Sequence, residues 1–195
     1  MGKKLSALLG VTSSIACYKA CSLTNILMKN NMEVKVVLTK NTELFIKSCV
    51  FEALSGNPVY VDMFAERALD AAIQHISLAK WCDFLVIAPA TANIIGKIAN
   101  GIADDLLSTT AMSLSAEKPI FIAPAMNTNM WNSPAVTRNI NVLSSTKVKA
   151  GNKSINKYYI IPPKEGRLAC GEYSVGALAK IEDIFKAITE VMYNK

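Results

Sequence analysis

The sequence has 195 residues, of which 51% are hydrophobic and only 18% are charged, and its formal net charge is +6. This length suits one sizeable core, and a charged fraction below the roughly 25% of typical soluble domains predicts that copies of the chain cover part of its surface. Lysines are scattered rather than gathered into a run, which argues against a nucleic-acid partner and suits an anionic small molecule.

Buried strands are predicted from short runs of apolar and β-branched residues, and the runs at 84–88 and 120–123 are apolar at every residue, as parallel strands covered on both faces tend to be. These runs lie at residues 5–11, 33–39, 84–88, 120–123 and 158–161. Helical patterns fall at residues 16–27, 91–99, 104–114, 134–143 and 181–193. The alternation predicts a three-layer, doubly wound α/β fold with a parallel sheet and helices on both faces. Residues 150–176, rich in Gly, Lys and Asn, are expected to form a long loop.

Ligands of such sheets bind beyond the carboxyl ends of the strands, so the segments after the strands are the candidate site. The first of them, GVTSSIA at 10–16, enters a helix with small residues, and its N–H groups and hydroxyls suit a phosphate. A simple capped helix explains this segment equally well. The absence of GxGxxG favours a mononucleotide over NAD. Thr39, which ends the second strand, is expected to add a hydroxyl to the same phosphate site.

Two later segments have unusual compositions. The small residues of APATAN at 88–93 would let a flat ring lie against the backbone, although a Pro-and-Thr helix start is an equal alternative. PAMNTNMW at 124–131 places Met and Trp beside amides, and apolar bulk of this kind walls a pocket or an interface. The amide of Asn127 is suited to bind a carboxylate through its N–H while remaining neutral.

His75 is the only histidine, which excludes a metal site built on imidazoles, and no metal is expected. A lone histidine is more often structural than catalytic, although it suits proton transfer. The five cysteines show no CxxC pairing, which indicates neither a disulfide framework nor a zinc site and favours the reducing cytoplasm. Four lie within helix- or strand-like patterns, whereas Cys170 lies in the long loop beside glycine and charge. Cys170 is either a proton donor or an accidental surface thiol.

Five ordered segments resemble the homo-oligomeric flavin-containing cysteine decarboxylases, a family of phosphopantothenoylcysteine decarboxylases and peptidyl-cysteine decarboxylases. The segments are TSSIACYK (12–19), HISLAKWCD (75–83), APATANIIGKIANGIADDLLST (88–109), PAMNTNMW (124–131) and ACGEYSVGAL (169–178). The resemblance extends over nearly the whole chain. It implies one Rossmann-like flavoprotein domain, residues 1–195, with a substrate-covering loop at about 162–178, and FMN as the cofactor.

The resemblance also implies a role for each segment. FMN would be held by Ser13, Ser14, Ile15, Thr39, Pro89, Ala90, Thr91, Ala92 and Ala125. His75 would be the base for the substrate thiol as the cysteinyl group is oxidised to a thioaldehyde, Asn127 would bind the carboxylate, and Cys170 would protonate the enethiol left by carbon dioxide. A neutral amide suits this step, because a cation would stabilise the carboxylate more than the departing carbon dioxide. Further substrate contacts would come from Met130, Ala169 and Gly171.

The implied reaction converts 4'-phosphopantothenoylcysteine into 4'-phosphopantetheine for coenzyme A synthesis, in a cytoplasmic trimer or dodecamer that shares sites between subunits and needs no membrane. The acidic residue after ACG at 169–171, and PAMN at 124–127, favour this branch. A peptidyl-cysteine decarboxylase, a flavin prenyltransferase and a phosphatase-binding regulatory protein remain alternatives. The chain departs from many relatives in having Ser13-Ser14 for Gly-Ser and in showing no synthetase domain, so another protein would supply the preceding step.

Overall fold

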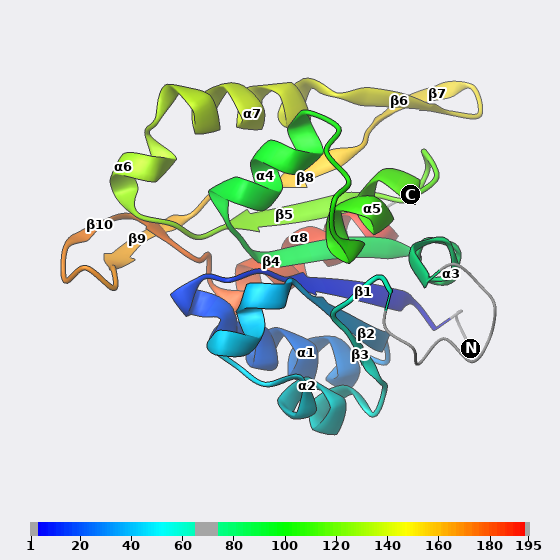
Figure 1. Ribbon diagram of the computed structural model, residues 1–195. Helices are drawn as coiled ribbons and strands as arrows, with labels where there is room; N and C mark the ends of the chain where they lie inside the picture. Colours follow the sequence, from blue (N-terminus) through cyan, green and yellow to red (C-terminus); the bar gives the residue numbers. More distant parts are fainter. Residues whose placement is uncertain (1–3, 65–73, 194–195) are drawn as a thin grey trace.

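The computed structural model describes residues 4–64 and 74–193. Within these residues, six strands form one sheet in the order β3-β2-β1-β4-β5-β8, and neighbouring strands are parallel (Figure 1). The strands are β1 (Ser6–Val11), β2 (Glu33–Leu38), β3 (Val59–Tyr60), β4 (Phe84–Ala90), β5 (Ile120–Pro124) and β8 (Tyr158–Ile160). The strand order reverses between β1 and β4, which confirms the predicted doubly wound α/β fold.

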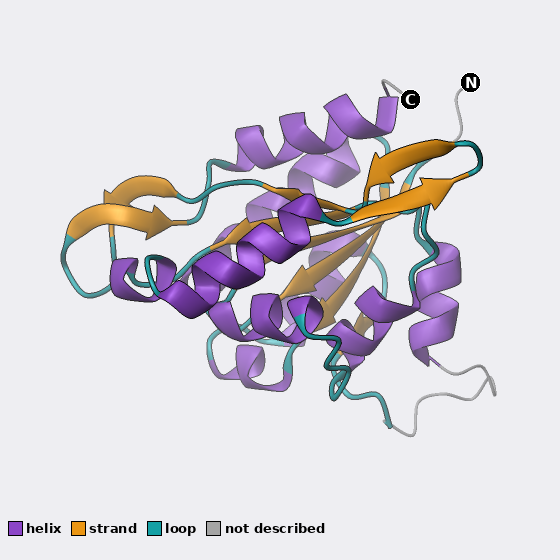
Figure 2. Cartoon of the chain, turned by 90° about the horizontal axis from the view of Figure 1, so that it is seen from above, coloured by secondary structure: helices purple, strands orange, loops and turns teal. Residues whose placement is uncertain are grey.

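Helices cover both faces of this sheet and make it the middle of three layers (Figure 2). One face packs against α1 (Lys19–Lys29), α2 (Ser48–Ser55) and α8 (Ile181–Tyr193). The other face packs against α3 (Gln74–Trp81), α4 (Ala92–Ala99), α5 (Leu106–Ser113) and α7 (Pro134–Ser145). No helix in residues 4–64 and 74–193 has the length and apolar character needed to cross a bilayer.

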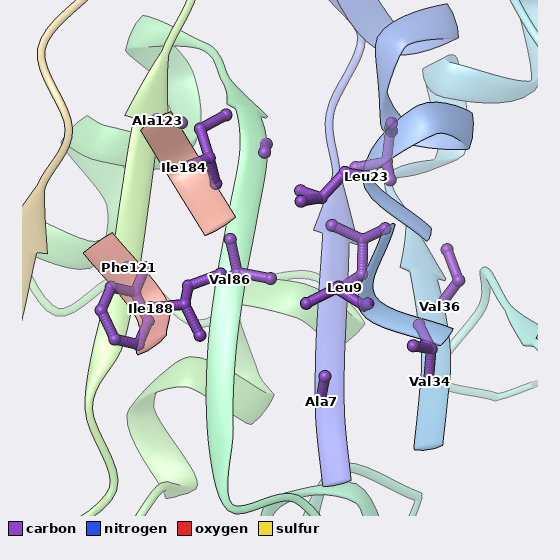
Figure 3. Close-up of a cluster of buried hydrophobic side chains, with 14 of the residues drawn as sticks. Ala7, Leu9, Leu23, Val34, Val36, Val86, Phe121, Ala123, Ile184 and Ile188 are labelled. Atoms are coloured by element: carbon purple, nitrogen blue, oxygen red, sulfur yellow. The ribbon is translucent and has the colours of Figure 1, made fainter. Parts of the chain in front are cut away.

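Each face of the sheet has its own hydrophobic core. Figure 3 shows the first, in which Leu9, Val86 and Phe121 from adjacent strands meet Leu23 of α1 and Ile184 of α8. The residues that follow or precede them along the strands point to the second core, because side chains alternate between the two faces. Every residue of β4 and β5 is consequently buried, which explains their uninterrupted apolar runs.

Local sequence fixes where the helices begin. Asp105 caps α5 by accepting a hydrogen bond from the Ser108 N–H at 2.8 Å, and the Ser108 hydroxyl accepts from the Asp105 N–H. Ser133 caps α7 directly before Pro134, whose missing N–H costs nothing in the first turn. These capped starts refine the predicted helices 104–114 and 134–143 by only a few residues.

The prediction of one long loop at 150–176 is wrong. Besides β8, this region contains β7 (Lys153–Asn156), which pairs with β6 (Lys147–Ala150), and β9 (Lys164–Arg167), which pairs with β10 (Tyr173–Ala177). Both pairs are antiparallel hairpins, so the expected substrate-covering loop at 162–178 is mostly a hairpin. Their strands expose most residues and therefore lack the apolar periodicity that reveals a strand in sequence.

Lys157, which directly precedes β8, is only 6% exposed. Its ammonium group donates hydrogen bonds to the carbonyl oxygens of Leu114 (3.3 Å), Ser115 (2.6 Å) and Lys118 (2.9 Å), just beyond the C-terminal end of α5. A cation there complements the negative end of the helix dipole. Burial nevertheless lowers the pKa of Lys157 to about 8.

This lowered pKa predicts a pH dependence of stability. Above about pH 8 the native state releases a proton that an unfolded lysine keeps until about pH 10.4, so the unfolding free energy contributed by Lys157 rises with pH in that window. Between about pH 7.5 and about pH 9.5, we expect the unfolding free energy of wild type to rise by roughly 2 kcal/mol relative to that of Lys157→Met, as measured by urea denaturation. If the difference in unfolding free energy between wild type and Lys157→Met does not change in this direction with pH, the lowered pKa of Lys157 is contradicted.

Candidate functional site

A cavity of about 440 Å³ opens where β1, β4 and β5 end, beside the hairpin β9–β10. This is the left end of the sheet in Figure 1. Its volume lies within the usual range for small-molecule sites. Most predicted site residues line it, namely Ser13, Ser14, Ile15, Thr91, Ala125, Asn127, Met130, Ala169 and Cys170.

The turn after β1 presents polar groups to the cavity. The Ser14 hydroxyl accepts a hydrogen bond from the Ala16 N–H at 3.4 Å and caps the short 3-10 helix η1 (Ile15–Tyr18), which leads into α1. Neither the N–H nor the hydroxyl of Ser13 has a hydrogen-bond partner among the described residues, and the Thr91 hydroxyl also has none there. Donors without partners at the edge of a cavity suit an anionic ligand.

Thr12 joins the two strand ends on either side of this turn. Its side chain is 1% exposed, donates to the Pro89 carbonyl at 2.7 Å and accepts from the Thr91 N–H at 3.0 Å. A buried hydroxyl with both bonds made fixes the spacing of the loops after β1 and β4. Thr12 belongs to the predicted phosphate segment 10–16, but the sequence gives it no role of its own in joining the two loops.

Some predicted FMN contacts do not line the cavity. Pro89, Ala90 and Ala92 are not among its lining residues, and the Ala90 carbonyl accepts a hydrogen bond from the Ala125 N–H at 3.0 Å, which holds the β4 and β5 loops together. Thr39 also lies outside the lining, and its hydroxyl shares a 2.9 Å hydrogen bond with Thr42. In a single copy of the chain, these residues therefore do not face the cavity.

Asn127 and Cys170 come together although 43 residues separate them. The Asn127 Nδ2 atom donates to the Cys170 Sγ atom at 3.6 Å, and Asn127 Oδ1 accepts from the Asn129 N–H at 2.8 Å, which fixes the amide orientation. The Cys170 thiol in turn donates to the Glu172 carboxylate at 3.7 Å. Amide, thiol and carboxylate therefore form one hydrogen-bonded chain at the cavity. Glu172 is the acidic residue that follows ACG and is not among the predicted site residues.

The hairpin β9–β10 is held to the loop after β5 and to α6 (Thr128–Trp131). The Met126 N–H donates to the Gly176 carbonyl at 3.0 Å, and the Thr128 hydroxyl donates to the Val175 carbonyl at 2.7 Å and bonds to the Ser174 hydroxyl. Gly176 has φ of 148°, and a Cβ there would overlap the Met126 carbonyl oxygen. The close approach that brings Cys170 to Asn127 therefore requires glycine.

We expect Gly176→Ala to release the hairpin from α6. The added methyl group cannot fit beside Met126, so cleavage within residues 164–177 under limited proteolysis should become faster by about tenfold. Gly166→Ala is the matched control on β9, because its Cβ would meet only the Ala177 Cβ at 3.4 Å. Equal cleavage rates for Gly176→Ala and the control would rule out this explanation.

His75 does not reach the cavity of its own chain. It lies on α3, at the end of the sheet opposite the hairpin β9–β10 in both overall views (Figures 1 and 2). Its Nδ1 atom is buried and has no hydrogen-bond partner among the described residues. Gly171 also lies outside the cavity lining, at the tip of the hairpin, where φ is 92°.

The other cysteines behave as structural thiols or lie away from the cavity. Burial raises the pKa of Cys17, Cys21 and Cys82, the last to about 11, so these groups remain protonated at neutral pH. Cys49 is exposed on α2 and lies outside the cavity lining. Two cations that the sequence analysis did not select, Lys19 and Arg167, line the cavity and have no ion-pair partner among the described residues.

Comparisons with known proteins give matches over nearly the whole chain. The Flavoprotein family matches residues 1–193. "Coenzyme A biosynthesis bifunctional protein CoaBC" of Bacillus subtilis is 45% identical over 93% of this chain, and the chain spans only 41% of that relative's length. "Probable phosphopantothenoylcysteine decarboxylase" of Streptococcus mutans is 40% identical over 97% of this chain and 99% of that protein.

Solved structures share the fold over almost the full length. A cysteine-to-serine mutant of a PPC decarboxylase complexed with pantothenoylaminoethenethiol is 31% identical, with a TM-score of 0.82 over 99% of this chain and 100% of that one. "The FMN binding protein AtHal3" is 32% identical, with a TM-score of 0.81 over 99% of both chains. "Peptidyl-cysteine decarboxylase EpiD" is 25% identical, with a TM-score of 0.76 over 95% of this chain and 99% of that one.

Proposed function

The chain belongs to the Flavoprotein family, among the flavin-containing cysteine decarboxylases, and we propose that it decarboxylates 4'-phosphopantothenoylcysteine to 4'-phosphopantetheine. The observation that carries the proposal is the contact between Asn127 and Cys170 at the cavity. This pair offers a neutral donor for a carboxylate and a proton for the carbon that loses it. The reaction is a step in the synthesis of coenzyme A, and the free thiol of its product suits a reducing cytoplasm.

FMN fits the cavity by the chemistry of its walls. Ser13 and Thr91 supply donors without other partners, Ser14 caps a helix start beside them, and Ala125 leaves room for a flat ring. We propose that the phosphate lies at the turn after β1 and the ring between the loops after β4 and β5. When bound, FMN would accept a hydride from the carbon that bears the thiol and would later return that hydride.

The residues of the chain then divide the work on the substrate. Asn127 binds and orients the carboxylate without a positive charge, so it does not stabilise the ground state more than the departing carbon dioxide. The hydrogen bond from Asn127 holds Cys170 at the same place, and Cys170 gives a proton to the carbon that has lost carbon dioxide. The hydrogen bonds that hold the hairpin β9–β10 to α6 and to the loop after β5 keep the Cys170 thiol beside this carbon.

We propose that His75 acts in the cavity of a second copy of the chain, because the cavity of its own chain lies at the far end of the sheet. Exposed apolar side chains lie on two different surfaces that could meet in such a pair. One surface lies beside the cavity and contains Ile15, Tyr18, Leu44 and Phe45. The other lies near α3 and α5 and contains Ile76, Ile102 and Met112. Two unlike surfaces make a head-to-tail contact, and we propose that this contact closes as a ring such as a trimer, from which a dodecamer would be built.

The direct test is incubation of the purified protein with 4'-phosphopantothenoylcysteine without added cofactor. We expect a yellow protein that yields 4'-phosphopantetheine, detected by mass spectrometry. A yellow protein that leaves this substrate untouched would overturn the proposed substrate. Peptides with C-terminal cysteine would then be tested, because the peptidyl-cysteine decarboxylase EpiD shares the fold.

A further inference from the structure

Glu172 stands beside Cys170 for a structural reason. The hairpin tip folds back on itself, since the Gly171 N–H donates to the Leu168 carbonyl at 2.9 Å and the Leu168 N–H donates to the Glu172 carbonyl at 2.8 Å. Gly171 permits this turn with φ of 92°. The turn places the Glu172 carboxylate where it accepts the thiol hydrogen at 3.7 Å.

The sulfur of Cys170 therefore lies between a donor and an acceptor. The Asn127 amide donates to the sulfur, and the sulfur donates to Glu172. Both bonds can be present together only while the thiol carries its hydrogen. Among the described residues, neither of the two cations at the cavity, Lys19 and Arg167, donates a hydrogen bond to this thiol, so the Glu172 carboxylate is the charged group bonded to it.

We propose that Glu172 is a positioning residue for Cys170, holding the protonated thiol beside Asn127 and so setting the fraction of product that leaves fully reduced. This inference rests on the proposed function. In the step concerned, the S–H bond of Cys170 breaks and a C–H bond forms at the carbon that has lost carbon dioxide. The thiolate that remains takes a proton from solvent on the exposed side of Glu172, and bound reduced flavin would supply the hydride that completes the reduction.

The first test compares products from the flavin-loaded wild type, Glu172→Ala, Glu172→Gln and Glu165→Ala. We expect Glu172→Ala to raise the ratio of oxidised enethiol to 4'-phosphopantetheine by about threefold to tenfold, the effect of one hydrogen bond. Glu172→Gln keeps an acceptor oxygen and should restore most of the wild-type ratio. Glu165→Ala removes a carboxylate from β9 of the same hairpin, outside the cavity lining, and should leave the ratio unchanged.

Two product outcomes would overturn the inference. One is an unchanged ratio in Glu172→Ala, and the other is an equal loss of both products, which would indicate only a role in hairpin structure. The ratio separates these cases because a hairpin defect slows decarboxylation and reduction together, whereas loss of thiol positioning affects the reduction alone.

A second readout does not depend on turnover. Alkylation by iodoacetamide requires the thiolate, so the Cys170 thiol must first break its bond to Glu172. Peptide mass spectrometry should show Cys170 reacting about threefold faster or more in Glu172→Ala than in wild type or Glu165→Ala. Equal rates would overturn the inference. If Cys170 is alkylated faster in Glu172→Ala but the wild type does not turn over the substrate, the proposed function is overturned, whereas the coupling between the thiol and the Glu172 carboxylate is still supported.

Discussion

Replacing Cys170 by serine is expected to change the product from 4'-phosphopantetheine to the oxidised enethiol, while carbon dioxide release continues. Serine keeps the size of the side chain and its place beside Asn127, but its hydroxyl is a far weaker acid than a thiol. We expect formation of the reduced product to fall by about 10²-fold or more, the usual contribution of a positioned acid. Both products can be separated by liquid chromatography and identified by mass.

Cys49→Ser is the matched control for Cys170→Ser, because Cys49 is the other exposed thiol among the described residues and lies on α2 outside the cavity lining. The control should give the wild-type product. Continued formation of 4'-phosphopantetheine by Cys170→Ser would exclude Cys170 as the proton donor.

The central sheet could be predicted because burial on both faces leaves a direct mark on sequence. Strands such as β4 and β5 are buried at every position, and short runs of apolar residues that alternate with helical patterns are typical of such strands. The position of the site followed from the same prediction, since the ends of parallel strands meet at one edge. Asn127 and Thr91 accordingly line one cavity although they follow different strands.

Features that depend on pairing between distant segments could not be predicted in the same way. The hairpin β9–β10 is stabilised by contacts with α6 and by the fit of Gly176 against Met126, and neither leaves a periodic pattern. The role of Thr12 depends on hydrogen bonds to Pro89 and Thr91, which are distant in sequence. Glu172 acquires its contact with Cys170 only through a turn that Gly171 permits.

His75 shows a different limit of sequence reasoning. The segment HISLAKWCD at 75–83 was selected by resemblance, but a sequence does not say which copy of a chain supplies a residue. Its position on α3 separates it from the cavity of its own chain, and the proposed sharing between copies is therefore a separate claim from its catalytic role. Two variants tested together can separate these claims.

His75→Asn is expected to lower total product formation by about 10²-fold to 10⁴-fold, because an amide cannot take the proton of the substrate thiol. The variant should still be yellow and fold normally, which absorbance and urea denaturation check. Unchanged turnover would exclude His75 as the base. Gln74→Ala, a change at the neighbouring residue of α3, controls for disturbance of the helix.

Mixed oligomers of His75→Asn and Cys170→Ser should form 4'-phosphopantetheine although neither variant alone does so. If each site takes His75 from one copy and Cys170 from the next, random mixing leaves about one quarter of the sites with both residues intact. If both residues act within one chain, every site in the mixture carries one defect and no reduced product forms. Co-expression with two different affinity tags isolates the mixed oligomers, and the presence or absence of 4'-phosphopantetheine decides between a shared site and a site within one chain.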